Sequence, residues 1–319
     1  MASEAATTKR SRLRAPGFLL ALPAWAWLLF FFVIPVAFIV YYSFGYKPGL
    51  LTLKPGQINT IATDKLGFSS YHEAWTMADG AVVRTFKQTL EISILGTLLC
   101  LIIAFPFAYW LAVKVPEKWR GVLLGLILVP FWTNFLVRTI GWQILLTPDG
   151  WLSTGLQSIH LRSTPLSILD TRAAVQLGVV YNYLVLMILP LFVSLDRLDP
   201  ALREASKDLG ANRVKTFLQV TLPLSTPGII SGMLLVFIPL SGDYITASVL
   251  GGAKGTMVGQ FVYEEFLTAQ NWAVGSAMAM ILMGMILAAV LIFGAVFFIV
   301  SRVLRQRRKV VLAPLGATA

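Results

Sequence analysis

The chain has 319 residues, of which 57% are hydrophobic and only 13% are charged; its formal net charge is +11 and its mean hydropathy is +0.75. A soluble domain carries roughly 25% charged residues and rarely exposes large apolar patches, so this composition excludes a water-soluble fold. The basic residues lie between long apolar runs, which argues against nucleic-acid binding. A single cysteine, Cys100, and two distant histidines are too few for an intrachain disulfide or a metal centre.

Six apolar runs are long enough to cross a bilayer, which takes about 20 residues. They cover residues 17–44, 89–113, 121–146, 173–195, 226–250 and 275–300. The first run follows a basic segment, but it is too long for a signal peptide and lacks a small-residue cleavage site, so we expect it to be retained. The pattern predicts an all-α membrane protein whose six-span domain covers residues 17–300, between basic tails at 1–16 and 301–319.

The distribution of basic residues predicts how the chain crosses the membrane. Seventeen of the 26 lysine and arginine residues fall in the two tails and in segments 114–120 and 197–215. Because basic loops stay on the cytoplasmic side, we expect both termini to be cytoplasmic. The expected location is the cell membrane, inner or plasma, with membrane lipid around the spans.

The polar segment 196–225 predicts two short helices separated by a turn. Asp199 suits the N-cap of the first helix, Pro200 suits its first position, and Gly210 suits the left-handed residue that ends a helix. Between them, apolar residues recur at spacings of three and four and form one face: Leu198, Leu202, Ala205 and Leu209. A second amphipathic stretch begins near Val214 and is expected to end at Leu222 and Pro223. A basic amphipathic loop lying on lipid headgroups would show the same pattern.

The same segment carries a spaced residue pattern. Glu204, Ala205 and Ser206 are followed after three residues by Gly210, and after nine more by the sequence Val-Thr-Leu-Pro at 220–223. This resembles the EAA loop of binding-protein-dependent ABC importers, where Glu-Ala-Ala, Gly and Ile-x-Leu-Pro stand at these spacings. Serine for alanine and valine for isoleucine are conservative departures that keep the spacing.

The resemblance implies the type I ABC importer permease fold, with segment 196–225 as a cytoplasmic helix-turn-helix coupling loop. In that family the first short helix inserts into a groove on the ATPase subunit, a helix-in-groove contact. The coupling residues it implies here are Glu204, Ala205, Ser206, Leu209, Gly210, Leu222 and Pro223. The implied partners are two ATPase subunits, a second and different permease subunit, and an extracytoplasmic solute-binding protein.

The chain lacks the G-x-x-x-x-G-K-[ST] motif of P-loop ATPases and any catalytic constellation. We therefore expect it to be no enzyme and to bind no cofactor, with ATP used by the partner subunit. A membrane enzyme or scaffold that anchors through its basic loop is the alternative from another class, and it leaves the loop pattern unexplained.

Segments 129–142, 235–252 and 265–277 resemble the spermidine/putrescine type of permease, the B-type subunit. Polyamines are flexible polycations, which carboxylates and aromatic faces can bind. An acidic residue within a span is expensive and indicates function by default, so Asp243 is the leading substrate-path candidate, with Tyr244 and Trp132 as aromatic surface.

Other interpretations of these features stay open. Asp243 could instead follow a helix end at Gly242, with its side chain among the outer headgroups. The solute could be another small polar molecule, such as an amino acid derivative or a phosphonate. Glu91, Glu264 and Glu265 are expected to be solvated charges or docking contacts for a binding protein, and Arg138 an external contact or a snorkelling side chain.

Overall fold

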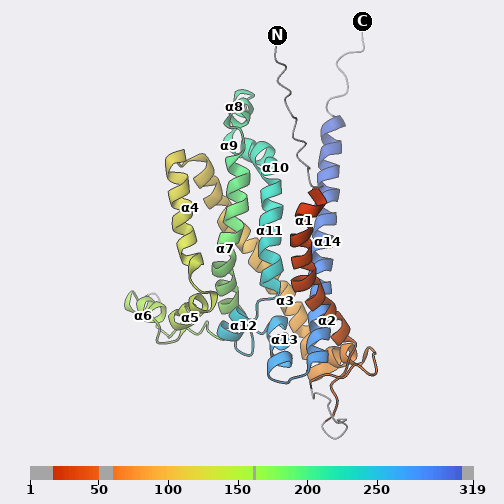
Figure 1. Ribbon diagram of the computed structural model, residues 1–319. Helices are drawn as coiled ribbons and strands as arrows, with labels where there is room; N and C mark the ends of the chain where they lie inside the picture. The colour runs from red at the N-terminus through yellow and green to blue at the C-terminus, as the bar shows by residue number, and fades with distance from the viewer. Residues whose placement is uncertain (1–16, 50–59, 161–162, 311–319) are drawn as a thin grey trace, which may run out of the picture.

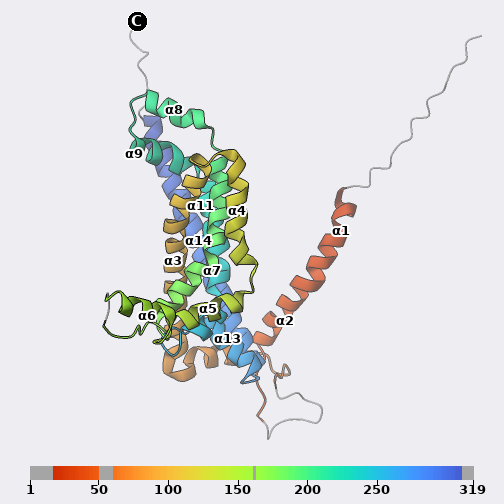
Figure 2. The same cartoon turned by 90° about the vertical axis from the view of Figure 1, so that its left-hand side faces the viewer.

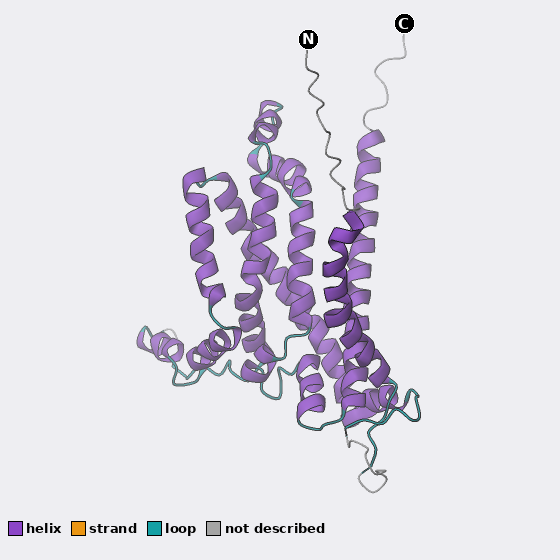
Figure 3. Ribbon diagram, viewed as in Figure 1, coloured by secondary structure: helices purple, strands orange, loops and turns teal. Residues whose placement is uncertain are grey.

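A computed structural model describes residues 17–49, 60–160 and 163–310. Within these residues the regular structure is helical, apart from an isolated β-bridge between Tyr46 and Ala62 (Figure 3). The elements are α1 (Gly17–Leu28), the π-helical turn η1 (Leu29–Val33), α2 (Ile34–Ser43), α3 (Ser69–Val113), α4 (Glu117–Trp132), α5 (Phe135–Leu146), α6 (Trp151–Ser158), α7 (Arg172–Asp196), α8 (Pro200–Asp208), α9 (Arg213–Thr216), the π-helical turn η3 (Phe217–Thr221), α10 (Leu222–Leu224), α11 (Thr226–Ser241), α12 (Ile245–Leu250), α13 (Val258–Leu267) and α14 (Trp272–Val310).

Four to six segments of the described chain can cross a membrane by length and composition. The four continuous candidates are Ala21–Ser43, Gly80–Val113, Arg172–Asp196 and Trp272–Ile299. Two bent helix pairs bring the number to six: Glu117–Trp132 with Phe135–Ser158, and Arg213–Leu224 with Thr226–Ser241. The helical membrane architecture expected from the sequence is thus confirmed, while the count of six stays a prediction.

The third apolar run is broken, contrary to the continuous span expected over 121–146. Helix α4 and the following segment Phe135–Ser158, which begins with α5, meet at an angle of 83°. Thr133 and Asn134 between them have extended backbones, and the Asn134 Oδ1 atom accepts the N–H of Leu136 at 2.8 Å. An asparagine at an N-cap starts a new helix, which explains why α5 leaves the direction of α4.

The expected bounds of other runs also change. The fifth run stops at Ser241, and its last residues form the separate helix α12. Helix α3 begins at Ser69, twenty residues before the expected second span, and α14 continues to Val310, beyond the expected start of the tail at 301. The tail 1–16 and the last residues of the other tail, 311–319, lie outside the described residues.

Helix α7 lies at the centre of the bundle, packed against α3 and α11. Two glycines one turn apart, Gly228 and Gly232, let α11 approach α7 closely. A Cβ atom added at Gly228 would lie 2.4 Å from the Cβ atom of Ser194, and one added at Gly232 would lie 2.7 Å from the sulfur of Met187. Small residues spaced four apart are a common way for membrane helices to pack backbone against backbone.

The first span stands apart from this bundle. In Figure 2, α1 and α2 point away from the other helices at an angle, and α2 packs against α14. The span 21–43 contains two tryptophans and three consecutive phenylalanines. No residue in its most apolar window is buried. Apart from the contact of α2 with α14, the surface of this span is therefore left uncovered by the described part of the chain.

The bundle has two distinct ends (Figure 1). Helices α8 and α9 project at one end, toward which the start of α1 and the end of α14 also point. Helices α5, α6, α12 and α13 lie at the opposite end. The expected coupling loop and the expected substrate carboxylate, which stands between α11 and α12, are thus separated by the length of α11.

Candidate functional site

The first candidate site is the projecting helix α8, which begins where the sequence predicts. The Asp199 Oδ1 atom accepts the N–H of Ala201 at 2.9 Å, and Pro200 occupies the first helical position. An aspartate at the N-cap satisfies one of the amide groups that have no partner inside the helix, and proline there has no amide to satisfy. Local chemistry therefore fixes the start of α8.

The end of α8 is also confirmed. Gly210 has a φ of +82°, a conformation that suits glycine. The Gly210 N–H donates to the Lys207 carbonyl at 2.8 Å, and the Ala211 N–H donates to the Ser206 carbonyl at 3.1 Å. This pair of bonds is the Schellman motif, which turns the chain sharply after the helix.

The apolar face of α8 is uncovered. No residue of the helix is buried, and Leu209 is 89% exposed. The orientation of the helix is nevertheless defined, because the Ser206 hydroxyl lies 3.2 Å from the Thr216 hydroxyl of α9. Next to this bond the surface is hollowed, and the hollow is lined by Leu202, Ala205, Ser206, Leu209, Gly210, Ala211, Lys215, Gln219 and Val220. This part of the loop is an oriented apolar surface with a concave flank.

The second half of the loop joins α8 to the bundle. The ring of Phe217 lies edge-on to Phe105 and Tyr109 of α3, with centroid distances of 5.6 and 6.0 Å. The helical stretch ends within one residue of the expected position: Leu222 and Pro223 belong to α10, which ends at Leu224, and the chain bends by 62° at the following break, before α11. Helical structure therefore continues from the loop almost directly into the fifth span.

Glu204 faces the opposite flank of α8. It lines a second hollow, between α8, α9 and the end of α3, together with Tyr109, Val113, Lys114, Pro200, Arg203, Lys207, Arg213, Val214, Thr216 and Phe217. Four of these residues are basic and one is acidic. This flank therefore carries net positive charge, whereas the flank at Leu209 mixes apolar and polar side chains and contains a single charged residue, Lys215.

The second candidate site is the buried carboxylate of Asp243, which is 6% exposed. Its Oδ1 atom accepts the N–H of Thr246 at 2.9 Å, and its Oδ2 atom accepts the Thr246 hydroxyl at 2.5 Å. Gly242 ends α11, as one interpretation of the sequence held. The side chain of Asp243, however, turns inward and caps the following helix α12. A buried carboxylate needs such donors because desolvation of its charge is costly.

The two aromatic candidates are placed differently. Tyr244 is partly exposed and stacks on Tyr263 of α13, with a centroid distance of 4.9 Å and an interplanar angle of 13°. Trp132, at the end of α4, is 79% exposed, and among the described residues no ring contact joins it to Tyr244. Tyr263 was not predicted, because nothing local in the sequence distinguishes it from other aromatic residues.

Arg138 is not the external or snorkelling side chain expected from the sequence. It is half-buried, and its guanidinium carbon lies 5.2 Å from the ring centre of Phe131 and 5.6 Å from that of Phe135. These rings stand on either side of the break between α4 and α5. Cation–π contacts are worth about 0.5–2 kcal/mol depending on burial, so Arg138 contributes to the stability of the bend in the third span.

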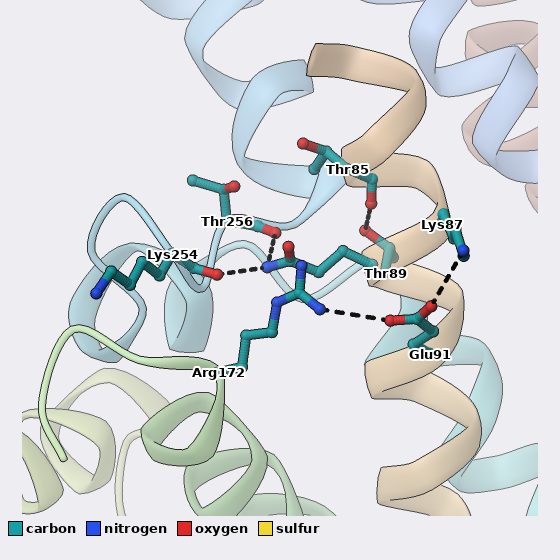
Figure 4. A network of polar contacts seen from close by, with 8 residues as sticks. Thr85, Lys87, Thr89, Glu91, Arg172, Lys254 and Thr256 are labelled. Atoms are coloured by element: carbon teal, nitrogen blue, oxygen red, sulfur yellow. Dashed lines mark hydrogen bonds and ion pairs between the residues drawn. The ribbon is translucent and has the colours of Figure 1, made fainter. Parts of the chain in front are cut away.

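Charged residues near the middle of α3 form ion pairs on the surface (Figure 4). Glu91 pairs with Lys87 at 3.9 Å and with Arg172 of α7 at 3.5 Å. All three side chains are exposed, so each pair is worth at most about 1 kcal/mol. The expectation of a solvated Glu91 agrees with this exposure.

The same region of α3 fixes the connection between α12 and α13. The Gln88 side-chain amide donates to the carbonyls of Lys254 and Thr256 at 2.8 and 3.0 Å. The Thr89 hydroxyl accepts the N–H of Val258 at 2.9 Å. These bonds satisfy backbone groups in the connection between α12 and α13 that have no helical hydrogen-bond partner. They hold α12 and α13 at a fixed distance from α3.

Glu265 in α13 is buried, whereas the sequence suggested a solvated charge. It is 6% exposed, and one of its carboxylate oxygens is buried without a hydrogen-bond partner. Burial raises the pKa of Glu265 above its ordinary value; Glu73 and Glu264 raise it further, while Lys47 opposes them. Exposed Glu264, by contrast, accepts a hydrogen bond from Gln260 at 3.1 Å.

Comparison with known proteins identifies the fold and the family. Residues 104–310 match the family described as binding-protein-dependent transport system inner membrane component. The spermidine/putrescine transport system permease protein PotB of Haemophilus influenzae is 37% identical over 282 residues, which cover 88% of this chain and 93% of that protein. PotB of Escherichia coli K12 is 39% identical over 214 residues, covering 66% and 78%.

A solved structure of a bacterial ABC transporter that imports alginate has a chain of the same fold. Its TM-score is 0.65 at 17% identity, with 88% of this chain and 93% of that chain covered. A related structure is a complex with an alginate-bound periplasmic protein, with the same TM-score at 16% identity and 86% and 91% coverage. This chain belongs to the family of binding-protein-dependent transport system inner membrane components.

Proposed function

We propose that this chain is the permease subunit of an ATP-driven importer that moves polyamines such as spermidine and putrescine into the cytoplasm. The observation that carries the importer mechanism is the exposed, oriented apolar face of α8. The named relatives support the choice of substrate, because PotB proteins share 37–39% identity with this chain.

Helix α8 would insert into a groove on an ATPase subunit. Its exposed apolar residues supply the anchoring surface and the charged residues around them the polar rim, the features of a helix that binds in a groove. Glu204, Ala205, Ser206, Leu209 and Gly210 are the proposed docking residues. Rigid capping at both ends of α8 lowers the entropy lost on docking.

Motion of the ATPase subunits would reach the spans by two routes. The first is the ring contact of Phe217 with Phe105 and Tyr109, which joins the loop to α3. The second is the nearly continuous helical path through Leu222 and Pro223 into α11. Displacement of α8 would thereby tilt two spans and switch the path between outward and inward openings.

Asp243 would bind an ammonium group of the substrate near the end of α11, with Tyr244 and Trp132 offering aromatic faces. In the described conformation, both carboxylate oxygens accept bonds from Thr246. A cation must therefore compete with these donors or approach when α12 moves. Such binding would be reversible, as transport requires.

The remaining assignments follow from the charge pattern and the family. Both termini and α8 would face the cytoplasm, and the end with α5, α12 and α13 would face an extracytoplasmic solute-binding protein. The importer would contain a second permease subunit and two ATPase subunits that hydrolyse ATP, while this chain binds no cofactor of its own.

The test is ATP-dependent uptake of labelled spermidine and putrescine into vesicles that contain this chain with the ATPase, permease and binding protein encoded beside it. Uptake that disappears when this chain is omitted would support the proposal. Binding-protein-stimulated ATP hydrolysis without polyamine uptake would contradict the substrate and leave an importer for another small polar solute. Full uptake in the absence of any ATPase partner would contradict the importer mechanism.

A further inference from the structure

Asn182, in the middle of α7, lies where the outer segments of the two interrupted apolar runs meet. These segments are α5, which follows the break in the third run, and α12, which follows the end of α11. Helix α12 packs against both α5 and α7, and α5 also packs against α7. Asn182 is 1% exposed, so its amide lies inside this three-helix contact.

The Asn182 side chain is hydrogen-bonded to one threonine from each neighbouring helix. Its Nδ2 atom donates to the Thr139 hydroxyl of α5 at 3.1 Å and to the Thr246 hydroxyl of α12 at 3.5 Å. The two hydrogens of one NH2 group thus bind two different helices, and the second bond is the longer and weaker one.

The orientation of the amide follows from a count of hydrogens. The Thr139 hydroxyl donates its hydrogen to the Phe135 carbonyl at 2.9 Å, and the Thr246 hydroxyl donates its hydrogen to Asp243. Each hydroxyl can then only accept from Asn182, because a hydroxyl has a single hydrogen. The amide must present NH2 to both threonines, which leaves its own Oδ1 atom buried without a partner. The two donated bonds are retained at the cost of one unpaired acceptor.

The resulting chain of bonds ends at two functional points. Through Thr139 it reaches the Phe135 carbonyl, in the first turn of α5 after the 83° bend. Through Thr246 it reaches Asp243, the proposed substrate carboxylate. A displacement at either point changes the geometry around the same NH2 group.

We propose that Asn182 is a positioning residue that ties α5 and α12 to α7, so that the outer segments of both interrupted runs move as one body during transport. The transport role rests on the proposed function, whereas the mechanical link can be measured without any transported solute. No neutral side chain of similar size other than asparagine can donate two hydrogens at this position.

The experiment measures the distance between α5 and α12 in the complete reconstituted importer. Nitroxide labels are placed at Val137 and Ser248, both exposed, in a Cys100→Ala background, and pulsed EPR distances are recorded with and without ATP. With Asn182 present we expect one narrow distribution in each state. Asn182→Leu should widen this distance distribution roughly twofold or more, because interhelical polar bonds of this kind restrain helix positions.

The isosteric variant Asn182→Asp sharpens the test. It retains the volume but replaces the NH2 group with a second acceptor. Both threonine hydroxyls already donate their hydrogens elsewhere, so they cannot donate to the new carboxylate, which also lies close to Asp243. Its distribution should be at least as broad as that of Asn182→Leu. If neither variant assembles, Thr139→Val and Thr246→Val carry the test, because each removes a single partner and should widen the distribution by a smaller amount.

The matched control is Asn271→Leu. Asn271 is another buried asparagine, but it accepts the N–H of Val274 at the start of α14 and lies outside this network. Its loss should leave the distance distribution unchanged. Unchanged widths in both Asn182 variants, or equal widening in the control, would overturn the proposal. If the parental importer moves no polyamine but shows the expected widths, only the substrate assignment fails.

Discussion

Leu209, in the projecting loop, is 89% exposed, whereas Asn182, in α7 inside the bundle, is 1% exposed. The usual arrangement is reversed at these two places: an apolar side chain faces outward and an amide faces inward. Covering apolar groups with another surface lowers the free energy, so α8 is suited to bind a second molecule. A buried amide must find its partners within the chain, so the Asn182 network is suited to hold helices together. Damage to α8 should therefore uncouple transport, while damage around Asn182 should change the bundle itself.

The largest effect is expected from Gly210→Val, which tests the α8 side of this comparison. A β-branched residue at a φ of +82° is strained by about 1–3 kcal/mol, so the end of α8 should rearrange. ATP-driven uptake should fall by roughly 10- to 100-fold, because this strain opposes the docked geometry. Membrane insertion should not change, because a Cβ atom added at Gly210 meets no atom within 4 Å apart from its chain neighbours.

The control for this variant is Gly210→Asn, since asparagine tolerates the left-handed conformation. It should retain most of the uptake. Full uptake in Gly210→Val vesicles would contradict a coupling role for the turn.

Asp243→Asn tests the buried side at its charged group. Asparagine can still accept the N–H of Thr246, so the cap of α12 should persist while the negative charge is lost. Hydrogen bonds to charged groups are worth about 1.5–3 kcal/mol, so we expect roughly tenfold slower polyamine uptake at equal expression. Asp149→Asn, at an exposed site between α5 and α6, is the matched control. Unchanged uptake kinetics in Asp243→Asn would remove Asp243 from the substrate path.

Gly228→Ala tests the close contact between α7 and α11, at the end of α11 that adjoins the loop. The added methyl group would lie 2.4 Å from the Cβ atom of Ser194 and 2.8 Å from the Pro190 carbonyl oxygen. Overpacking of this kind costs about 1–3 kcal/mol, so the thermal unfolding midpoint in detergent should fall. Gly284→Ala is the control, because a Cβ atom there meets nothing within 4 Å. Equal midpoints in the two variants would show that the helices separate easily.

The smallest effect concerns pH. The pKa of Glu265 is higher in the folded chain than in the unfolded one, mainly because the side chain is buried. The folded state then binds more protons, so its stability decreases as the pH rises from the unfolded pKa through the folded one. Thermal unfolding of Glu265→Gln should depend less on pH in that window. Glu117→Gln, at an exposed position in α4, should behave like the parent; an identical pH profile for Glu265→Gln would contradict the expected shift.

Local chemistry explains which features could be predicted from the sequence. The ends of α8 depend on Asp199, Pro200 and Gly210, which act within one or two turns of the chain, so their effect can be recognised without a fold. The apolar runs are visible for the same reason, because lipid imposes a length on each of them. The EAA-type spacing added the functional meaning of this loop.

The missed features depend on distant partners. Hydropathy stays high across the break between α4 and α5, so the single cap at Asn134 was hidden within an apolar run. Arg138 and Glu265 were assigned to the surface because each is charged, but rings of two helices cover the first and α13 with its neighbours encloses the second. Asn182 carried no signal at all, since its role requires the simultaneous positions of α5 and α12.

The isolated first span has a consequence for how this chain can change in evolution. Within the described chain, its most apolar window contains no buried residue, and the region matched by the family begins only at residue 104. In this window, selection imposed by the chain itself can therefore act on the length and hydropathy of the helix, but hardly on the shape of its side chains. The bundle, where one methyl group at Gly228 would collide with α7, has no such freedom. Outside the contact of α2 with α14, any selection on side-chain shape in the first span must come from lipid or from a second polypeptide.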